Sequence, residues 1–175
     1  WRTFQKAVPS KSWQDSEYKI NDIEHKSWNT ESKAWKTAVK ENTISAYRKY
    51  KLLYPNGQHY PQAEKKIIDL EVSDVFASGN YGQLPSMDRT GYSNSTYSTV
   101  SVRNDTQYTL TLLYSGVESK RLVISPHSSK SVRLKSGSYR IVASVNASNV
   151  RNFAGREELM GGSYDVSYYI QTSRF

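Results

Sequence analysis

A change in hydrophobic periodicity near residue 79 divides this chain of 175 residues. Before that point, apolar and aromatic residues recur three and four positions apart, and after it they alternate with polar residues. The first spacing is typical of one helix face, and the second is typical of a strand with one buried side. From residue 79 onward Ser, Thr, Asn and Tyr supply about two-fifths of the residues, which favours strands and turns. The sequence therefore predicts an α+β fold.

The first part of the chain predicts helices separated by clear breaks. Asn42 and Thr43 carry side chains that can accept the free amide hydrogens of a new helix start. Residues 55–57 (Pro-Asn-Gly) end the helix that follows, because proline lacks an amide donor and Asn-Gly readily adopts a positive φ. The expected helices cover residues 14–28, residues 34–39 with their flanks, residues 44–54 and residues 60–76.

Three strings of residues in this part resemble a known helical family. They are Ala34-Trp35-x-x-Ala38, then Asn42-Thr43-x-x-x-Tyr47-x-x-Tyr50, and then Tyr54-Pro55-x-Gly57-x-His59-x-x-x-Ala63. Together they resemble a tetratricopeptide-like helical hairpin over residues 31–75, as found in bacterial envelope lipoproteins and outer-membrane assembly factors. Because such arrays need about three repeats to bury a continuous core, one hairpin is expected to pack on something else, such as the second half of the chain.

The second part predicts short strands, each with one apolar face. They are punctuated by turns every 8–12 residues or so, which is typical of an antiparallel sandwich. We expect an immunoglobulin-like sandwich of about seven strands with one side facing water. The string from Asn104-Asp105-Thr106-x-Tyr108-x-Leu110 through Leu134-x-x-Gly137-x-Tyr139 is similar to sandwich domains of exported bacterial proteins, a likeness that implies no activity. The expected strands lie at residues 99–102, 108–114, 121–124, 131–134, 139–145, at the short pieces 153–154 and 158–160, and at 164–170.

These patterns predict a helical, tetratricopeptide-like region at residues 1–78, a linker at 79–95 rich in Gly, Pro and Asn, and a β-sandwich domain at 96–175. The chain starts at Trp1 and not at Met, so we expect a processed product whose signal or anchor lies upstream. With the family resemblances, this favours a location in the periplasm, in the cell envelope or outside the cell.

The net charge of +8 does not predict a nucleic-acid partner. There are 13 basic and 10 acidic residues before residue 79, and 11 and 6 after it, with no run of Lys or Arg in either half. Binding to a phosphate backbone needs several cations on one surface. No stretch approaches the ~18 apolar residues of a membrane helix, so we expect no span in this chain.

Few residues have the pattern of a catalytic or metal site. The chain has no Cys, and its three histidines, His25, His59 and His127, are expected to be solvated or structural. Glu157 and Glu158 are adjacent, so on a strand they would point to opposite faces. We therefore predict no enzyme, no cofactor and no metal. A hydrolase that uses His127 or the Glu157/Glu158 pair is the least favoured alternative.

The high tyrosine content is the feature of the sequence that says most about binding, because an exposed Tyr is large, stiff and able to donate a hydrogen bond at an interface. The candidate binding surface consists of Tyr81, Tyr92, Tyr97 and Tyr169. These rings could attach the helices to the sandwich, contact a protein partner or stack on sugars. The prediction is a non-catalytic protein-interaction or structural module of an exported or envelope-associated bacterial protein, with carbohydrate binding as the alternative.

Overall fold

A computed structural model describes residue 19, residues 28–148 and residues 150–170. The chain is α+β, with three helices and two mixed β-sheets in its described part. It divides into two compact units, residues 1–60 and residues 61–175, which are described separately. The predicted helix at 14–28 lies almost wholly outside the described residues.

The first unit contains a helix over residues 28–41 and α2 (Ile44–Leu53). Asn42 has a positive φ of 47° and donates its N–H to the Ala38 carbonyl at 2.9 Å, which ends the first helix. Thr43 is the N-cap of α2, and its hydroxyl accepts the Ala46 N–H at 3.2 Å. The predicted break at residues 42–43 is therefore confirmed.

Aromatic side chains form the core of the first unit. The Trp35 ring lies 5.7 Å from Tyr47 and 5.3 Å from Tyr50, and His59 stacks on Trp35 at 4.7 Å. The Tyr50 hydroxyl donates to Glu31 at 2.6 Å and accepts the His59 N–H at 3.2 Å. His59 thus fixes the turn after α2 through its backbone and its ring.

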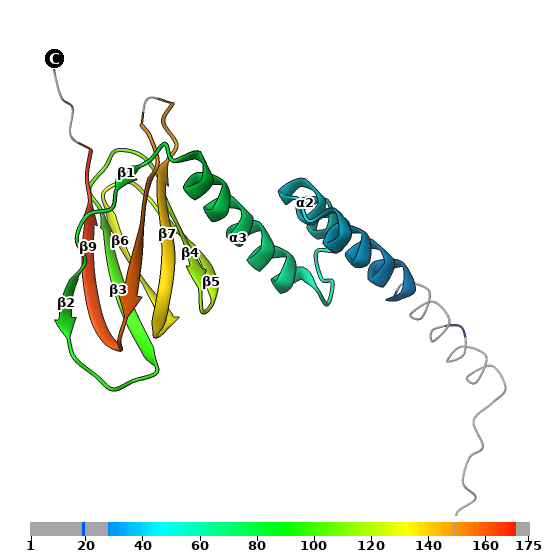
Figure 1. Ribbon diagram of the computed structural model, residues 1–175, viewed down its shortest axis with the longest axis horizontal. Helices are drawn as coiled ribbons and strands as arrows, with labels where there is room; N and C mark the ends of the chain where they lie inside the picture. The colour runs from blue at the N-terminus through cyan, green and yellow to red at the C-terminus, as the bar shows by residue number, and fades with distance from the viewer. Residues whose placement is uncertain (1–18, 20–27, 149, 171–175) are drawn as a thin grey trace, which may run out of the picture. The chain divides into compact units, whose positions relative to one another are not determined.

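The second unit contains α3 (Tyr60–Ser78), apart from its first residue, and two β-sheets. One sheet has the strand order β1-β8-β7-β4-β5 and the other has the order β2-β9-β3-β6 (Figure 1). The strands are β1 (Gly82–Gln83), β2 (Asp88–Gly91), β3 (Tyr97–Asn104), β4 (Leu110–Gly116), β5 (Ser119–Ile124), β6 (Ser128–Lys135), β7 (Gly137–Val145), β8 (Phe153–Leu159) and β9 (Gly162–Tyr168).

All seven predicted strands are present as β3 to β9, but the prediction of a purely antiparallel structure is wrong. β1 pairs with β8 in parallel, and β9 pairs with β3 in parallel along its whole length. The chain enters β9 from β8, a strand of the other sheet, so β9 runs in the same direction as β3. Residues 79–95, expected to be a linker, contain β1 and β2, which add one edge strand to each sheet.

The two sheets share one apolar core. It is built from alternate residues of strands in both sheets, so that Val100 and Val102 of β3 and Val166 of β9 face Leu112 of β4 and Ile141 of β7. Leu84 and Met87, from the segment between β1 and β2, pack against the same core. This segment crosses from one sheet to the other and covers the core along one side.

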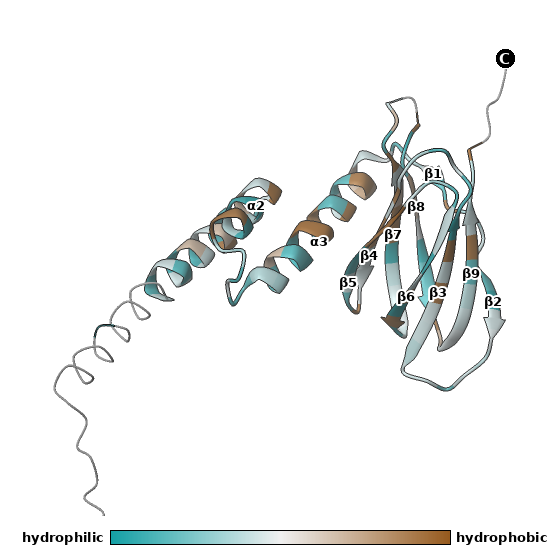
Figure 2. Ribbon diagram, turned by 180° about the vertical axis from the view of Figure 1, so that it is seen from behind, coloured by the Kyte–Doolittle hydropathy of each residue, from teal (hydrophilic) through white to brown (hydrophobic). Residues whose placement is uncertain are grey.

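Helix α3 covers the outer face of the five-stranded sheet. Its buried Ile68 and Val72 pack against Leu113 of β4, Val142 of β7 and Ala154 of β8. The hydropathy colouring shows hydrophobic (brown) segments on α3 and on the neighbouring strands (Figure 2). The expectation that one face of each sheet contacts water therefore holds for the four-stranded sheet only. In the five-stranded sheet, β4 and β7 are buried on both faces.

Polar contacts hold α3 in register on that sheet. Asp69 accepts hydrogen bonds from Ser115 at 2.8 Å and from Ser119 at 2.6 Å, and it pairs with Lys65 at 2.8 Å. Burial alone would raise the pKa of Asp69, but the bonds from Lys65, Ser119 and Ser115 hold this pKa below its usual value. Arg121 of β5 pairs with Glu71 of α3 at 2.8 Å.

Replacement of Val72 by Ala tests the docking of α3. The side chain is fully buried against the sheet, so Val72→Ala removes apolar contacts and leaves a small cavity. After allowance for the better helix propensity of Ala, we expect a loss of roughly 1–2 kcal/mol in the free energy of unfolding. Urea unfolding followed by far-UV circular dichroism measures it.

Val39→Ala is the matched control, because Val39 is exposed on the first helix. It should change the unfolding free energy by less than about 0.5 kcal/mol. Equal midpoints for Val72→Ala and the wild type would contradict the described packing of α3.

Candidate binding cleft

The four predicted tyrosines differ in exposure. Tyr92 and Tyr169 are 82% and 62% exposed, whereas Tyr81 and Tyr97 are half-buried. The Tyr81 ring packs against Phe76 of α3 at 5.4 Å, so it attaches the helix to the β unit. Two of the four side chains are therefore available to a partner over most of their surface.

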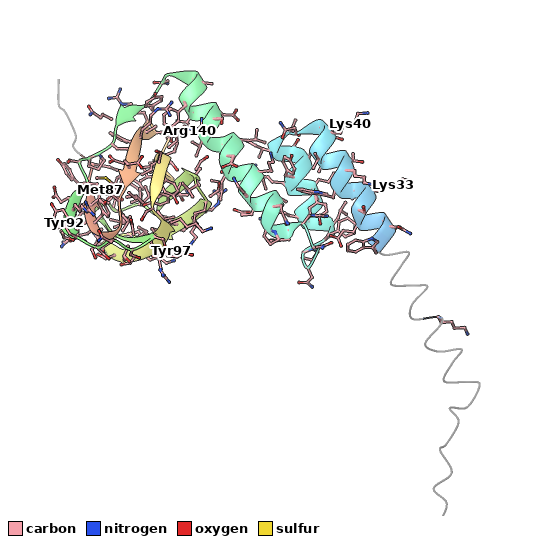
Figure 3. The ribbon with its side chains drawn as sticks, turned by 60° about the horizontal axis from the view of Figure 1, so that its bottom comes forward. Lys33, Lys40, Met87, Tyr92, Tyr97 and Arg140 are labelled. Atoms are coloured by element: carbon pink, nitrogen blue, oxygen red, sulfur yellow. The ribbon has the colours of Figure 1, made fainter. Side chains whose placement is uncertain are left out.

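The structure does not bring these tyrosines together into one surface. Gly91, next to Tyr92, pairs with Ser163 at the start of β9, and Tyr97 begins the neighbouring strand β3 at the same end of the sheet. Figure 3 labels Tyr92 and Tyr97 on this part of the β unit. Tyr169 follows the other end of β9, about 20 Å away at 3.3 Å per residue.

Arginine side chains occupy the faces of both tyrosines at the first end. The Arg89 guanidinium lies 4.4 Å from the Tyr92 ring, and Arg133 lies 4.0 Å from the Tyr97 ring. Arg89 also donates to the Met160 carbonyl at 2.8 Å and to the Gly161 carbonyl at 3.0 Å, which attaches the edge strand β2 to the loop before β9. This end is stabilised by internal cation–π contacts.

Tyr169 lies on the rim of a cleft of about 480 Å³ at the opposite end. The cleft lies where the last residues of β9 and β7 and the first residues of β4 and β8 meet, so it is the uncapped end of the core between the two sheets. Its lining consists of Gln83, Pro85, Thr106, Leu110, Ala143, Ser144, Val145, Val150, Arg151, Phe153, Ser167, Tyr168, Tyr169 and Ile170.

A buried asparagine organises the loops beside this cleft. Asn104 ends β3 and is fully buried. Its amide nitrogen donates to the carbonyls of Tyr108 at 2.8 Å and Ser125 at 2.9 Å, and its amide oxygen accepts the Thr106 hydroxyl at 2.8 Å. These bonds hold Thr106 in the wall of the cleft. The sequence pattern Asn-Asp-Thr indicated a turn, but it did not reveal that Asn104 joins the β3–β4 loop to the β5–β6 loop.

Arg151 is the one charged residue in the lining of the cleft. It precedes β8, and its Nε lies 3.3 Å from the position that a Cβ on Gly82 would occupy. The same Cβ would lie 2.7 Å from the Phe153 ring, so only glycine fits at residue 82. Neither Arg151 nor Gly82 stood out in the sequence, because they come together only through the parallel pairing of β1 with β8.

None of the described residues considered for catalysis lines the cleft, although His127 lies beside it, since its N–H donates to the carbonyl of the cleft residue Thr106 at 3.2 Å. His127 sits in the turn between β5 and β6 with a positive φ of 50°, and His59 belongs to the first unit. His25 lies outside the described residues. Within the described part of the chain, no group of three or more His, Cys, Asp or Glu residues is arranged to hold a metal ion.

Glu157 and Glu158 line a hollow at the other end of β8 together with Arg140 and Arg156. The two side chains leave opposite faces of the strand, as the sequence predicted, and Glu158 accepts a hydrogen bond from Ser138. Burial raises the pKa of Glu157, whose face of β8 also carries the core residue Leu159.

The raised pKa of Glu157 predicts a pH-dependent effect of Glu157→Gln. A carboxyl group whose folded pKa exceeds its unfolded pKa favours folding below the unfolded value, near 4.5, and loses that contribution as the pH rises through the folded value. The neutral Gln should therefore raise the melting temperature at pH 7 by roughly 2–4 °C, a small shift because the side chain is partly solvated. The gain should vanish below about pH 4.

Thermal unfolding at pH 3.5 and pH 7 measures this difference. A lower melting temperature for Glu157→Gln at pH 7 would show that the carboxylate stabilises the fold.

The described geometry defines a class of domain in which one helix covers one face of a two-sheet β core. The chain belongs to the family described as Domain of unknown function (DUF6759), whose family model matches residues 64–161, more than half of the chain. The match begins inside α3 and runs through β8, in agreement with the packing of α3 on the sheets. No curated protein matches the chain. No helix among the described residues is long and apolar enough to cross a membrane.

Proposed function

We propose that this chain is a non-catalytic interaction module of an exported or envelope-associated bacterial protein, and that its second unit binds a peptide segment of a partner protein in the cleft beside Tyr169. The observation that carries the proposal is the apolar lining of this open cleft of about 480 Å³. Clefts of this size with apolar walls and a few polar groups are typical of binding sites.

The chemistry of the cleft favours a peptide ligand. Core residues such as Leu110, Ala143 and Tyr168 form its floor, so an apolar side chain of a partner would extend the existing core. Tyr169 and Ile170 stand at the rim, and aromatic residues there supply large contact area with little loss of conformational freedom. The hydroxyl groups of Ser144 and Ser167 offer hydrogen bonds to a peptide backbone.

The proposal includes three finer expectations. These are a tetratricopeptide-like hairpin at residues 31–75, an immunoglobulin-like sandwich in the second unit, and a location outside the cytoplasm. Their support is the aromatic-Pro-x-Gly turn with its stacked His59, the two packed sheets, and the resemblance of both halves to exported proteins. Fractionation of cells that express the full-length native protein tests the location, and recovery from the cytosol alone would contradict it.

Selection of peptides from a random display library tests the cleft. Peptides selected on the full chain should bind Tyr169→Ala at least tenfold more weakly, because this rim ring is lost. Fluorescence polarisation of the labelled peptides measures the affinities. Tyr92→Ala is the matched control, since Tyr92 is also exposed but lies at the other end of the sheet. Peptides that lose affinity for Tyr92→Ala and keep it for Tyr169→Ala would place the binding site elsewhere.

Carbohydrate binding is the second candidate. It is favoured by the exposed Tyr169 ring beside the polar side chains of Gln83, Ser144 and Ser167, since sugars combine apolar faces with hydroxyl groups. A glycan array probed with the wild type, Tyr169→Ala and Tyr92→Ala tests this. Glycan signals that require Tyr169 would favour the carbohydrate function over the peptide function.

A further inference from the structure

The charged residues that line the cleft indicate which chemical class of ligand it can bind. Among the residues that line the cleft there is one Arg and no Asp, Glu, Lys or His. Arg151 is exposed, and no ion pair is recorded for it with any other residue of the described chain. An apolar cleft with one uncompensated guanidinium favours an apolar ligand with one negative charge.

The position of Arg151 is set by the strands around it. Its Nε approaches the bare Cα of Gly82 in β1, and Gly82 itself is buried against the Phe153 ring. Phe153 also lines the cleft. The Nε of this exposed arginine therefore lies beside an apolar wall, so that a ligand could contact both at once.

A guanidinium binds a carboxylate through two parallel hydrogen bonds, and such charge-assisted bonds are about twice as strong as neutral ones. The smallest peptide unit that combines a carboxylate with a large apolar group is the final residue of a chain. The side chain of this final residue can pack on the floor of the cleft, formed by Leu110, Ala143 and Tyr168, while the terminal carboxylate stays at the opening of the cleft. An amino-terminal residue would bring a positive charge to Arg151 and be repelled.

We infer that the cleft binds the free carboxyl terminus of a partner protein that ends in a large apolar residue, with Arg151 binding the terminal carboxylate. This inference rests on the proposed function and adds the chemistry of the recognised segment. The net charge of +8 of the whole chain assists the approach of such an anionic group.

A matched pair of peptides tests the inference on the full chain. A fluorescein-labelled peptide of sequence Gly-Ser-Gly-Ser-Leu-Phe is made with a free carboxyl terminus and, separately, with a terminal amide. Fluorescence polarisation should give a Kd at least tenfold lower for the acid than for the amide. Arg151→Gln should raise the Kd of the acid to that of the amide and leave the amide unchanged.

Arg103→Gln is the control, because Arg103 is exposed on β3, outside the cleft, and pairs with Asp105 at 2.6 Å. It should change neither Kd. Equal affinities for acid and amide in the wild type, or an acid that binds Arg151→Gln as tightly as the wild type, would overturn the inference.

The outcomes separate the inference from the proposed function. If both peptides bind equally and both lose affinity for Tyr169→Ala, the proposed peptide binding is supported, but the inferred binding of the terminal carboxylate by Arg151 is wrong. If neither peptide binds at millimolar concentration while peptides from the display library do, the carboxyl-terminal inference alone falls. If octanoate displaces the acid peptide with a Kd as low as that of the peptide, the ligand is a small amphipathic carboxylate and the assignment to a protein terminus is wrong.

Discussion

The burial of alternate apolar residues between two sheets is the constraint on which the rest of the second unit depends. Residues such as Val100, Leu112, Ile141 and Val166 lose almost all contact with water in this layer. Each fully buried side chain of this kind contributes about 1.5–3 kcal/mol, so the layer is a large favourable contribution against the conformational entropy lost on folding. The cleft is a consequence of the same layer. At the end where β9 stops, the core residue Tyr168 borders solvent, and the fold leaves apolar surface that a ligand can cover.

Sequence periodicity predicted the strands but not the layers that surround them. The alternation of buried and exposed residues in β3 and in residues 131–135 of β6 matches a sheet with one face in contact with water. In β4 and β7, by contrast, consecutive apolar residues such as Leu112-Leu113 and Ile141-Val142 indicate burial on both faces. Leu113 and Val142 are the residues that α3 covers. The packing of α3 on the five-stranded sheet therefore depends on side chains that a period-two pattern alone would assign to the solvent-exposed face.

The candidate site was predictable only in part, for a physical reason. Side-chain type marked Tyr169 as an exposed aromatic, and its exposure of 62% fits that expectation. The other components of the cleft are far apart in the chain. Arg151, Gln83 and Thr106 come together through the parallel pairing of β1 with β8 and the crossover into β9. A pattern read along the sequence contains no information about strand order, so neither the single charge of the cleft nor its position could be derived.

Lysine side chains protect the edge strands of the second unit from pairing with other chains. β5 and β6 are edge strands of the two sheets, and exposed edges invite pairing with other chains. Lys120 of β5 donates to the Arg133 carbonyl of β6 at 2.8 Å, and Lys130 of β6 donates to the Val123 carbonyl of β5 at 3.3 Å. These lysines cover carbonyl groups of the opposite edge, which blocks edge-to-edge association. The remaining edges, β1 and β2, are two and four residues long. Because the lysines suppress edge pairing and α3 covers the outer face of the five-stranded sheet, the open end of the core beside Tyr169 remains uncovered in the described part of the chain.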